Sequence, residues 1–216
     1  MSAKNLFQLV GVLALSLFLV QCRGKDNKVK EKTTQGMKEL VVDATDYKSW
    51  VYFSFEKGQV VATKDVHESF AKDASWDIAF HRYDFRTNGG ASGSHKGAVA
   101  ETQETDMNKE IPMPAESAFK KDEIGSLIVY FEVGENGKHD IKRAQIPVNY
   151  VLTTRKGEHI GAISSEGMPP VVKLSKKVYI VKTASGKLVK FKVTDYRNAH
   201  GKTGHIKFQY AFVAEK

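Results

Sequence analysis

The aromatic run Ser75–Gly93 (SWDIAFHRYDFRTNGGASG) constrains this fold more than any other stretch of the chain. Its first half is dense in aromatic and aliphatic side chains, and Asn88–Gly90 near its end favours a sharp turn, because glycine readily takes positive φ. The run predicts one long strand, buried on much of both faces, with a bulge or bend near His81–Arg82 that changes the phase of the pleat. One side is expected to carry Trp76, Ile78 and Phe80, and the other Ala79, Tyr83 and Phe85. Such a strand is too apolar to leave in water, so the rest of the chain must surround it.

Shorter strands are predicted on both sides of this run. They are Trp50–Phe55, Gln59–Thr63, Ser126–Val133, Val148–Thr153, His159–Ile163, Val178–Lys182, Leu188–Val193 and His205–Val213. Turns at Lys57-Gly58, Asn136-Gly137 and Ser185-Gly186 indicate hairpins, and Asn-Gly is the strongest short hairpin signal. In the last strand, alternation with polar residues predicts that Ile206, Phe208, Tyr210 and Phe212 point inward.

Little helix is expected. Asp65–Ala71 is predicted as one short helix capped by Asp65, and Met168-Pro169-Pro170 should interrupt any strand ladder, which predicts an exposed loop at 164–170. The chain of 216 residues is long enough for one well-cored domain. The pattern therefore predicts an all-β fold, a single and mostly antiparallel β domain.

The N-terminus has the layout of a bacterial lipoprotein. Lys4 supplies a positive start, Leu6–Val20 is almost entirely apolar, and Cys22, the chain's one cysteine, follows after Gln21, where a small residue is usual. This predicts a signal peptide at residues 1–21, a flexible charged tether at 22–37 that begins with lipidated Cys22, and the β domain at 38–216. The alternative is a cleaved signal peptide with an incidental cysteine. If Cys22 is lipidated, the mature chain has no free thiol.

Charge and motifs exclude several classes of protein. The formal charge is +8, or +7 without the signal peptide, whose only charged residue is Lys4. Lysines such as Lys190 and Lys192 alternate with apolar residues, which is typical of a solvated sheet face, so no nucleic-acid partner is expected. The chain contains no nucleophile elbow, zinc-protease, Walker or Cys-x-x-Cys motif, and its seven histidines have no zinc-ligand spacing. The sequence therefore predicts a protein that is not an enzyme.

Two residues in these segments call for individual interpretation. His81 lies inside the central aromatic run and is expected to be a hydrogen-bonded core histidine. Met168 lies between Gly167 and two prolines on the predicted loop. Its flexible thioether either packs beneath that loop or serves as a ligand.

The aromatic run, together with Trp50–Gly58, Lys173–Ser175 and Thr194–Tyr196, resembles the HmuY family over nearly all of residues 38–216. HmuY proteins are haem-binding, lipid-anchored surface proteins, or haemophores, of anaerobic Gram-negative bacteria. The resemblance implies a β fold likened to an open right hand, with haem b held as cargo between projecting hairpins or loops. It implies axial iron ligands from just after the hairpin turn at 135–138 and from the loop at 164–170. With both axial positions filled, such a site carries haem without oxygen chemistry.

Matched residue by residue, the resemblance implies His139 and Met168 as the axial pair. Ser165 and Ile141 fall near positions where other members have ligands, and neither side chain can bind iron. Imidazole nitrogen and thioether sulfur both suit haem iron. The second ligand is left open between His139, His159 and none, in which case the iron would be five-coordinate.

The shape of haem suggests further contacts. Its apolar plate favours walls such as Ile141 and Tyr150, and its propionates favour cations such as Lys138 and Lys142. Each of these side chains is equally compatible with an ordinary surface role.

The family resemblance implies an outer-membrane lipoprotein that faces the cell surface or is shed from it. It would take haem from host haemoproteins and pass it to a TonB-dependent outer-membrane receptor, touching the membrane only through its lipid anchor. One alternative is a surface module that binds an iron-free porphyrin, a siderophore or a glycan without iron ligation. Another is an adhesive or structural domain.

Overall fold

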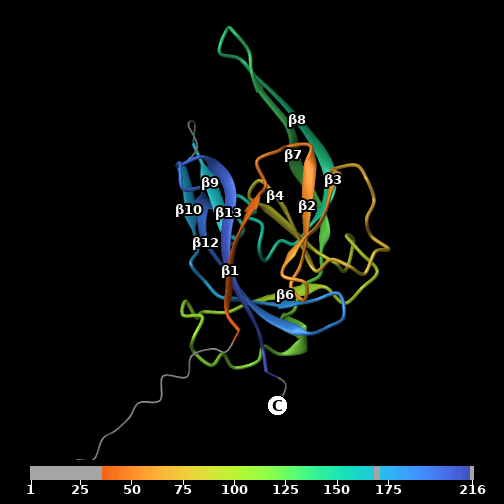
Figure 1. The fold of residues 1–216 in the computed structure, drawn as a ribbon. Coiled ribbons are helices and arrows are strands. Elements are labelled where there is room, and N and C mark those ends of the chain that lie inside the picture. The colour runs from red at the N-terminus through yellow and green to blue at the C-terminus, as the bar shows by residue number, and fades with distance from the viewer. Residues whose placement is uncertain (1–35, 168–170, 215–216) are drawn as a thin grey trace, which may run out of the picture. The chain divides into compact units, whose positions relative to one another are not determined.

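The structure is a computed structural model that describes residues 36–167 and 171–214 (Figure 1). Its strands are β1 (Lys38–Asp43), β2 (Ser49–Ser54), β3 (Gln59–Asp65), β4 (Ile78–His81), β5 (Asp84–Thr87), β6 (Ala98–Glu101), β7 (Glu123–Val133), β8 (His139–Val148), β9 (Ile163–Glu166), β10 (Val171–Leu174), β11 (Tyr179–Lys182), β12 (Leu188–Arg197) and β13 (Thr203–Phe212). One short 3-10 helix, η1 (Glu116–Ala118), precedes β7. Across the described ranges, no helix is long and apolar enough to span a membrane. The predicted all-β fold is confirmed.

The strands form two larger sheets and two hairpins. A five-stranded sheet has the order β1-β13-β12-β11-β6, and a four-stranded sheet has the order β3-β2-β4-β5. β7 pairs with β8 and β9 with β10, and all named strand pairs are antiparallel. This antiparallel pairing also matches the prediction.

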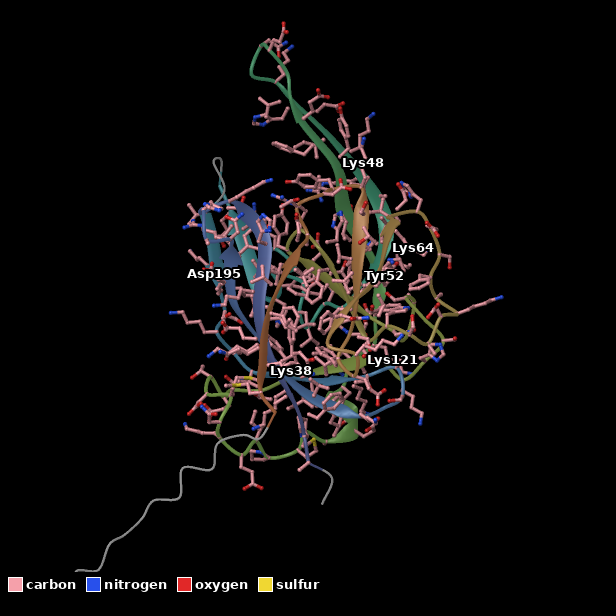
Figure 2. All side chains as sticks on the ribbon, in the orientation of Figure 1. Lys38, Lys48, Tyr52, Lys64, Lys121 and Asp195 are labelled. Atoms are coloured by element: carbon pink, nitrogen blue, oxygen red, sulfur yellow. The ribbon has the colours of Figure 1, made fainter. Side chains whose placement is uncertain are left out.

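The four-stranded sheet is the middle of three layers. The five-stranded sheet packs on one of its faces and the β7–β8 hairpin on the other, so both faces are apolar. In β2, Val51 and Phe53 face the five-stranded sheet and join one core cluster with Phe208. The intervening Trp50 and Tyr52 face the other way and pack with residues at the base of β7–β8. Successive strand side chains point to opposite faces, so a run that is apolar throughout suits this buried position. Tyr52 lies in the interior of the domain in Figure 2.

The central aromatic run is not one long strand, and this prediction was wrong. β4 and β5 form a tight hairpin in which His81 pairs with Asp84, with Arg82 and Tyr83 at the turn. Arg82 has a φ of 53°, a left-handed conformation that non-glycine residues seldom adopt. Its backbone N–H donates to Ala44 O at 3.0 Å and its Nη1 donates to Thr45 O at 2.9 Å. These distant partners hold the reversal.

The hairpin also changes the predicted sides of the run. Ile78, Phe80 and Phe85 lie in the core shared with the five-stranded sheet, while Trp76 and Ala79 lie in the core shared with β7–β8. Folding the run back on itself therefore fills both cores from one segment.

A buried carboxylate, Asp122, ties β5 to the segment before β7. It accepts hydrogen bonds from Thr87 N, Thr87 Oγ1, Ser92 Oγ and Asn149 Nδ2. Burial raises the pKa of Asp122 to about 6, outweighing these four donors, which favour the charged form. The Asp122 carboxyl is thus a satisfied but costly buried group.

The other predicted elements have mixed outcomes. The hairpins around residues 57–58, 135–138 and 185–186 are confirmed. His81 is fully buried, with Nε2 2.9 Å from Tyr47 O, as predicted for a core histidine.

Five local predictions were wrong. Residues 65–71 contain no helix, residues 149–153 form turns, residues 159–162 are not a strand, and residues 164–166 belong to β9. Phe212, predicted to point inward, is 40% exposed. It stands at the last position of β13, where the sheet ends and the alternation no longer implies burial.

Candidate functional site

The β7–β8 hairpin carries the candidate site. Its register runs from Glu123 opposite Val148 to Val133 opposite His139, and a tight turn connects the two strands. In that turn Gly134 N donates to Lys138 O at 2.8 Å and Gly137 takes a φ of 73°, which glycine adopts without strain. Figure 1 shows the hairpin running beyond the ends of the other sheets.

The outer half of the hairpin is joined to the domain by a row of aromatic rings. The ring of Phe131 lies between Tyr47, stacked at 5.9 Å, and His139, tilted at 5.4 Å. Tyr47 also meets the buried ring of His81 edge-on at 6.4 Å. We call Tyr47, Phe131 and His139 the aromatic row. It leads from the core to an exposed imidazole.

A cleft lies beside the aromatic row, with a volume of about 340 Å³. It is lined by Thr45–Lys48 from the β1–β2 connection and by Tyr130–Glu132 from β7. Lys48 lies close to the projecting hairpin in Figure 2, with its Nζ 5.5 Å from the centre of the Tyr130 ring. Lys142 Nζ lies 4.9 Å from the same ring, so two ammonium groups flank Tyr130. The hydrogen bond that Tyr130 donates to Glu132 raises the pKa of the Tyr130 hydroxyl.

Four of the predicted site residues come together on the outer hairpin. His139 begins β8, and Ile141 follows two positions later, so both lie on one face. Ile141 pairs with Phe131 and is 42% exposed, and Lys142 pairs with Tyr130. Lys138 lies in the turn and donates its backbone N–H to Asn136 Oδ1 at 2.9 Å.

Tyr150 is not part of this group. It follows the other end of β8, where Val148 pairs with Glu123, and it packs against the core beneath the hairpin. The guanidinium carbon of Arg155 lies 3.6 Å from the centre of its ring. The role of Tyr150 in a haem pocket stays a prediction that this geometry does not favour.

The second predicted ligand, Met168, lies outside the described residues, as does Cys22. Met168 falls between β9 and β10, and Ser165 pairs with Val172 in that hairpin. Figure 1 shows the ends of β9 and β10 that flank residues 167–170 at the same end of the domain as the β7–β8 turn. The two hairpins therefore end on the same side of the domain, and the pairing of His139 with Met168 across them stays a prediction.

His159 stays a predicted alternative ligand for the haem iron. Its Nε2 lies 3.1 Å from Val151 O, and because a carbonyl only accepts, this nitrogen carries the proton. In the neutral imidazole, Nδ1 then has the lone pair that a metal needs. A histidine whose second nitrogen donates to a carbonyl is a common arrangement in metal sites.

Tyr47 was not singled out from the sequence as a site residue. It stands in the short connection between β1 and β2, far in the chain from Phe131, so only the tertiary fold joins them. The one signal for Tyr47 in the sequence is its position, an aromatic residue in a loop just before the apolar strand that begins near Trp50.

Known structures resemble this one over most of the domain. A candidate HmuY-like haem-binding protein of Bacteroides vulgatus is 27% identical, with a TM-score of 0.60 over 81% of this chain and 90% of that one. A candidate lipoprotein of Bacteroides fragilis is 26% identical, with a TM-score of 0.63 over 83% and 91% of the two chains. The apo form of the HmuY analogue of Tannerella forsythia is 26% identical, with a TM-score of 0.57 over 85% and 100%.

A search of curated protein sequences finds no match to the chain. The family model of the HmuY protein matches residues 46–210, which include the central aromatic run, the aromatic row and both hairpins. That span is most of the domain, and the chain belongs to the HmuY family.

Proposed function

We propose that this protein is a haem-binding surface lipoprotein that carries haem b as cargo. Membership of the HmuY family supports this, as do structural neighbours that are described as HmuY-like and haem-binding. The observation that carries the proposal is the exposed imidazole of His139 at the end of the aromatic row, on a hairpin that projects from the domain.

The outer hairpin offers an imidazole and apolar surface on one of its faces, and lysines at its turn and on its opposite face. His139 supplies an imidazole nitrogen for the iron, and Phe131 and Ile141 supply apolar surface for the macrocycle. Lys138 and Lys142 are the proposed partners of the propionates, and Lys48 adds a third cation beside the cleft.

Met168 is the proposed ligand on the opposite face of the haem. A thioether and an imidazole together fill both axial positions, which leaves no open position for oxygen. The protein would then hold haem and perform no reaction on it, so we propose a binding protein and not an enzyme.

The wider role follows from the same proposal. Lipidated Cys22 would anchor the chain in the outer membrane, and residues 22–37 would act as its tether. A neighbour described as a candidate lipoprotein supports the anchor. We propose that the protein takes haem from host haemoproteins and delivers it to a TonB-dependent outer-membrane receptor.

Absorbance titration of the protein with haemin tests the proposal. A saturable, sharpened Soret band is expected, and His139→Ala and Met168→Ala should each shift the spectra of the oxidised and reduced complexes. His200→Ala is the matched control, because His200 is an exposed histidine in the turn between β12 and β13. Absence of a saturable Soret change in the wild-type chain would exclude haem binding. An unchanged spectrum for Met168→Ala would remove that ligand alone.

A second candidate function is the binding of an iron-free porphyrin. It is favoured by one observation: Ile141 and Ser165, near which other family members would place ligands, lack a donor for iron. Protoporphyrin distinguishes the two functions. If His139→Ala weakens haemin binding and leaves protoporphyrin binding unchanged, iron ligation is supported. Equal affinities of the wild type for haemin and protoporphyrin would favour the iron-free porphyrin. Failure to bind either would leave siderophores and glycans as the candidate ligands.

A further inference from the structure

A buried arginine outside the candidate haem site forms no salt bridge with any of the described residues. Arg86 lies in β5 and is only 6% exposed. Its guanidinium carbon lies 4.4 Å from the centre of the Trp50 ring, 4.9 Å from that of Tyr52 and 5.9 Å from that of Trp76. The aromatic side chains thus surround the guanidinium without using any of its N–H groups.

None of the residues that the structure describes forms a hydrogen bond or a salt bridge with Arg86, and its buried Nε has no partner. The nearby carboxylate of Asp122 already accepts four hydrogen bonds, two from Thr87 and one each from Ser92 and Asn149. Burial lowers the pKa of Arg86 to about 10, and the charge on Asp122 opposes this shift. Arg86 is therefore a buried cation at neutral pH. A buried charge without a partner is costly, and cation–π contacts recover only part of that cost.

The guanidinium borders a cavity of about 240 Å³. Phe70, Ile146 and Pro147 give the cavity an apolar wall, and Ser69 and Gln145 contribute polar groups. Its one acidic residue, Glu68, pairs with Lys64 at the surface. The cavity shares no lining residue with the cleft beside the aromatic row, so it is a separate site.

We propose that this cavity binds a small aliphatic carboxylate, which pairs with the guanidinium of Arg86 and lays its alkyl chain against Phe70, Ile146 and Pro147. A carboxylate matches the planar fork of arginine with two parallel hydrogen bonds. A neutral ligand would leave the charge unpaired. The volume is below the roughly 300–1,000 Å³ that holds drug-sized ligands, which favours a short chain.

The site contains its own reporter. The chain has two tryptophans, Trp50 and Trp76, and both border Arg86 and are fully buried. Titration of the haem-free protein with sodium butyrate should therefore change tryptophan emission in a saturable way. Butyramide is the matched neutral ligand, and sodium chloride at equal concentration controls for ionic strength.

Two substitutions test where the carboxylate binds. Ala91→Leu fills the cavity from an exposed position and leaves Arg86 in place, so it should abolish the butyrate response in a folded protein. Ala199→Leu, at an exposed turn elsewhere, is the control and should respond as the wild type does. Arg86→Lys keeps the charge but loses the fork, and should weaken butyrate binding at least tenfold.

The outcomes are decisive in both directions. A saturable response to butyrate that is absent with butyramide and lost in Ala91→Leu supports the site. No saturable response, an equal response to butyramide, or a full response in Ala91→Leu overturns the proposal. Because the haem-free protein is used, a negative result leaves the proposed haem function untouched.

Discussion

Phe208 and Phe212 lie on the same face of β13 by simple alternation. Because they are buried to different extents, they should contribute differently to the free energy of unfolding. Phe208 is fully buried, and its ring centre lies 5.3 Å from that of Phe53, 5.2 Å from that of Phe80 and 5.4 Å from that of Phe191. Phe→Ala at such a site costs about 3–5 kcal/mol, because a cavity remains. Phe212 is 40% exposed, so Phe212→Ala loses about 60% of a full burial energy of ~1.5–3 kcal/mol, or roughly 1–2 kcal/mol.

Urea unfolding of the haem-free protein, followed by tryptophan emission, measures both changes. Phe208→Ala should lower the free energy of unfolding by about 2–3 kcal/mol more than Phe212→Ala, which corresponds to a difference in Tm of about 5–10 °C for a domain of this size. Phe208→Leu is the milder variant if the alanine protein does not fold. Equal losses for the two alanine variants would show that alternation, and not the observed burial, sets the energy of this strand.

Three further predictions concern the core, the turns and the site. Burial raises the pKa of Asp122 to about 6, above its unfolded value of 3.8, so its ionisation should cost the folded state up to about 3 kcal/mol as pH rises from 4 to 7. The wild type should lose that much stability relative to Asp122→Asn over this window in urea titrations, and a constant difference would contradict it. Gly161→Ala should destabilise by about 1–3 kcal/mol, because its Cβ would stand 2.1 Å from Leu152 O. Gly137→Ala, with open space but a φ of 73°, should cost about 1–2 kcal/mol, and a urea midpoint left unchanged by either substitution would be contrary evidence. Tyr47→Ala should weaken haemin binding about fivefold to tenfold through loss of its stack on Phe131, while Tyr47→Phe keeps wild-type affinity in the same Soret titration.

Local signals in the sequence were enough to predict most hairpins. Asn136-Gly137 and Ser185-Gly186 specify turns through residues that tolerate positive φ, and the flanking strands alternate. The reversal at Arg82 was predicted only as a bulge or bend near His81–Arg82, because no turn residue marks it. A continuous apolar run indicates burial on both faces but not where the chain turns back. Here the turn depends on hydrogen bonds to Ala44 and Thr45, which are distant in sequence.

In the candidate site, too, some residues could be predicted from the sequence and others could not. His139 could be predicted because it follows a recognisable hairpin turn and because the family resemblance points to that position. Tyr47 could not, since its stacking on Phe131 exists only once the β1–β2 connection lies beside β7. The surroundings of Arg86 are equally non-local, because aromatic residues from β2 and from the segment before β4 surround a side chain of β5.

The β7–β8 hairpin divides stability and function along its length. At its base, Leu127, Ile146 and Val148 are buried against the four-stranded sheet and anchor the hairpin in the core. Beyond the bulge between Ile128 and Tyr130, the side chains are exposed or half-buried, and the aromatic row supplies the contacts with the domain. Residues of the outer half can therefore differ among family members at little cost in folding, since few core contacts depend on them.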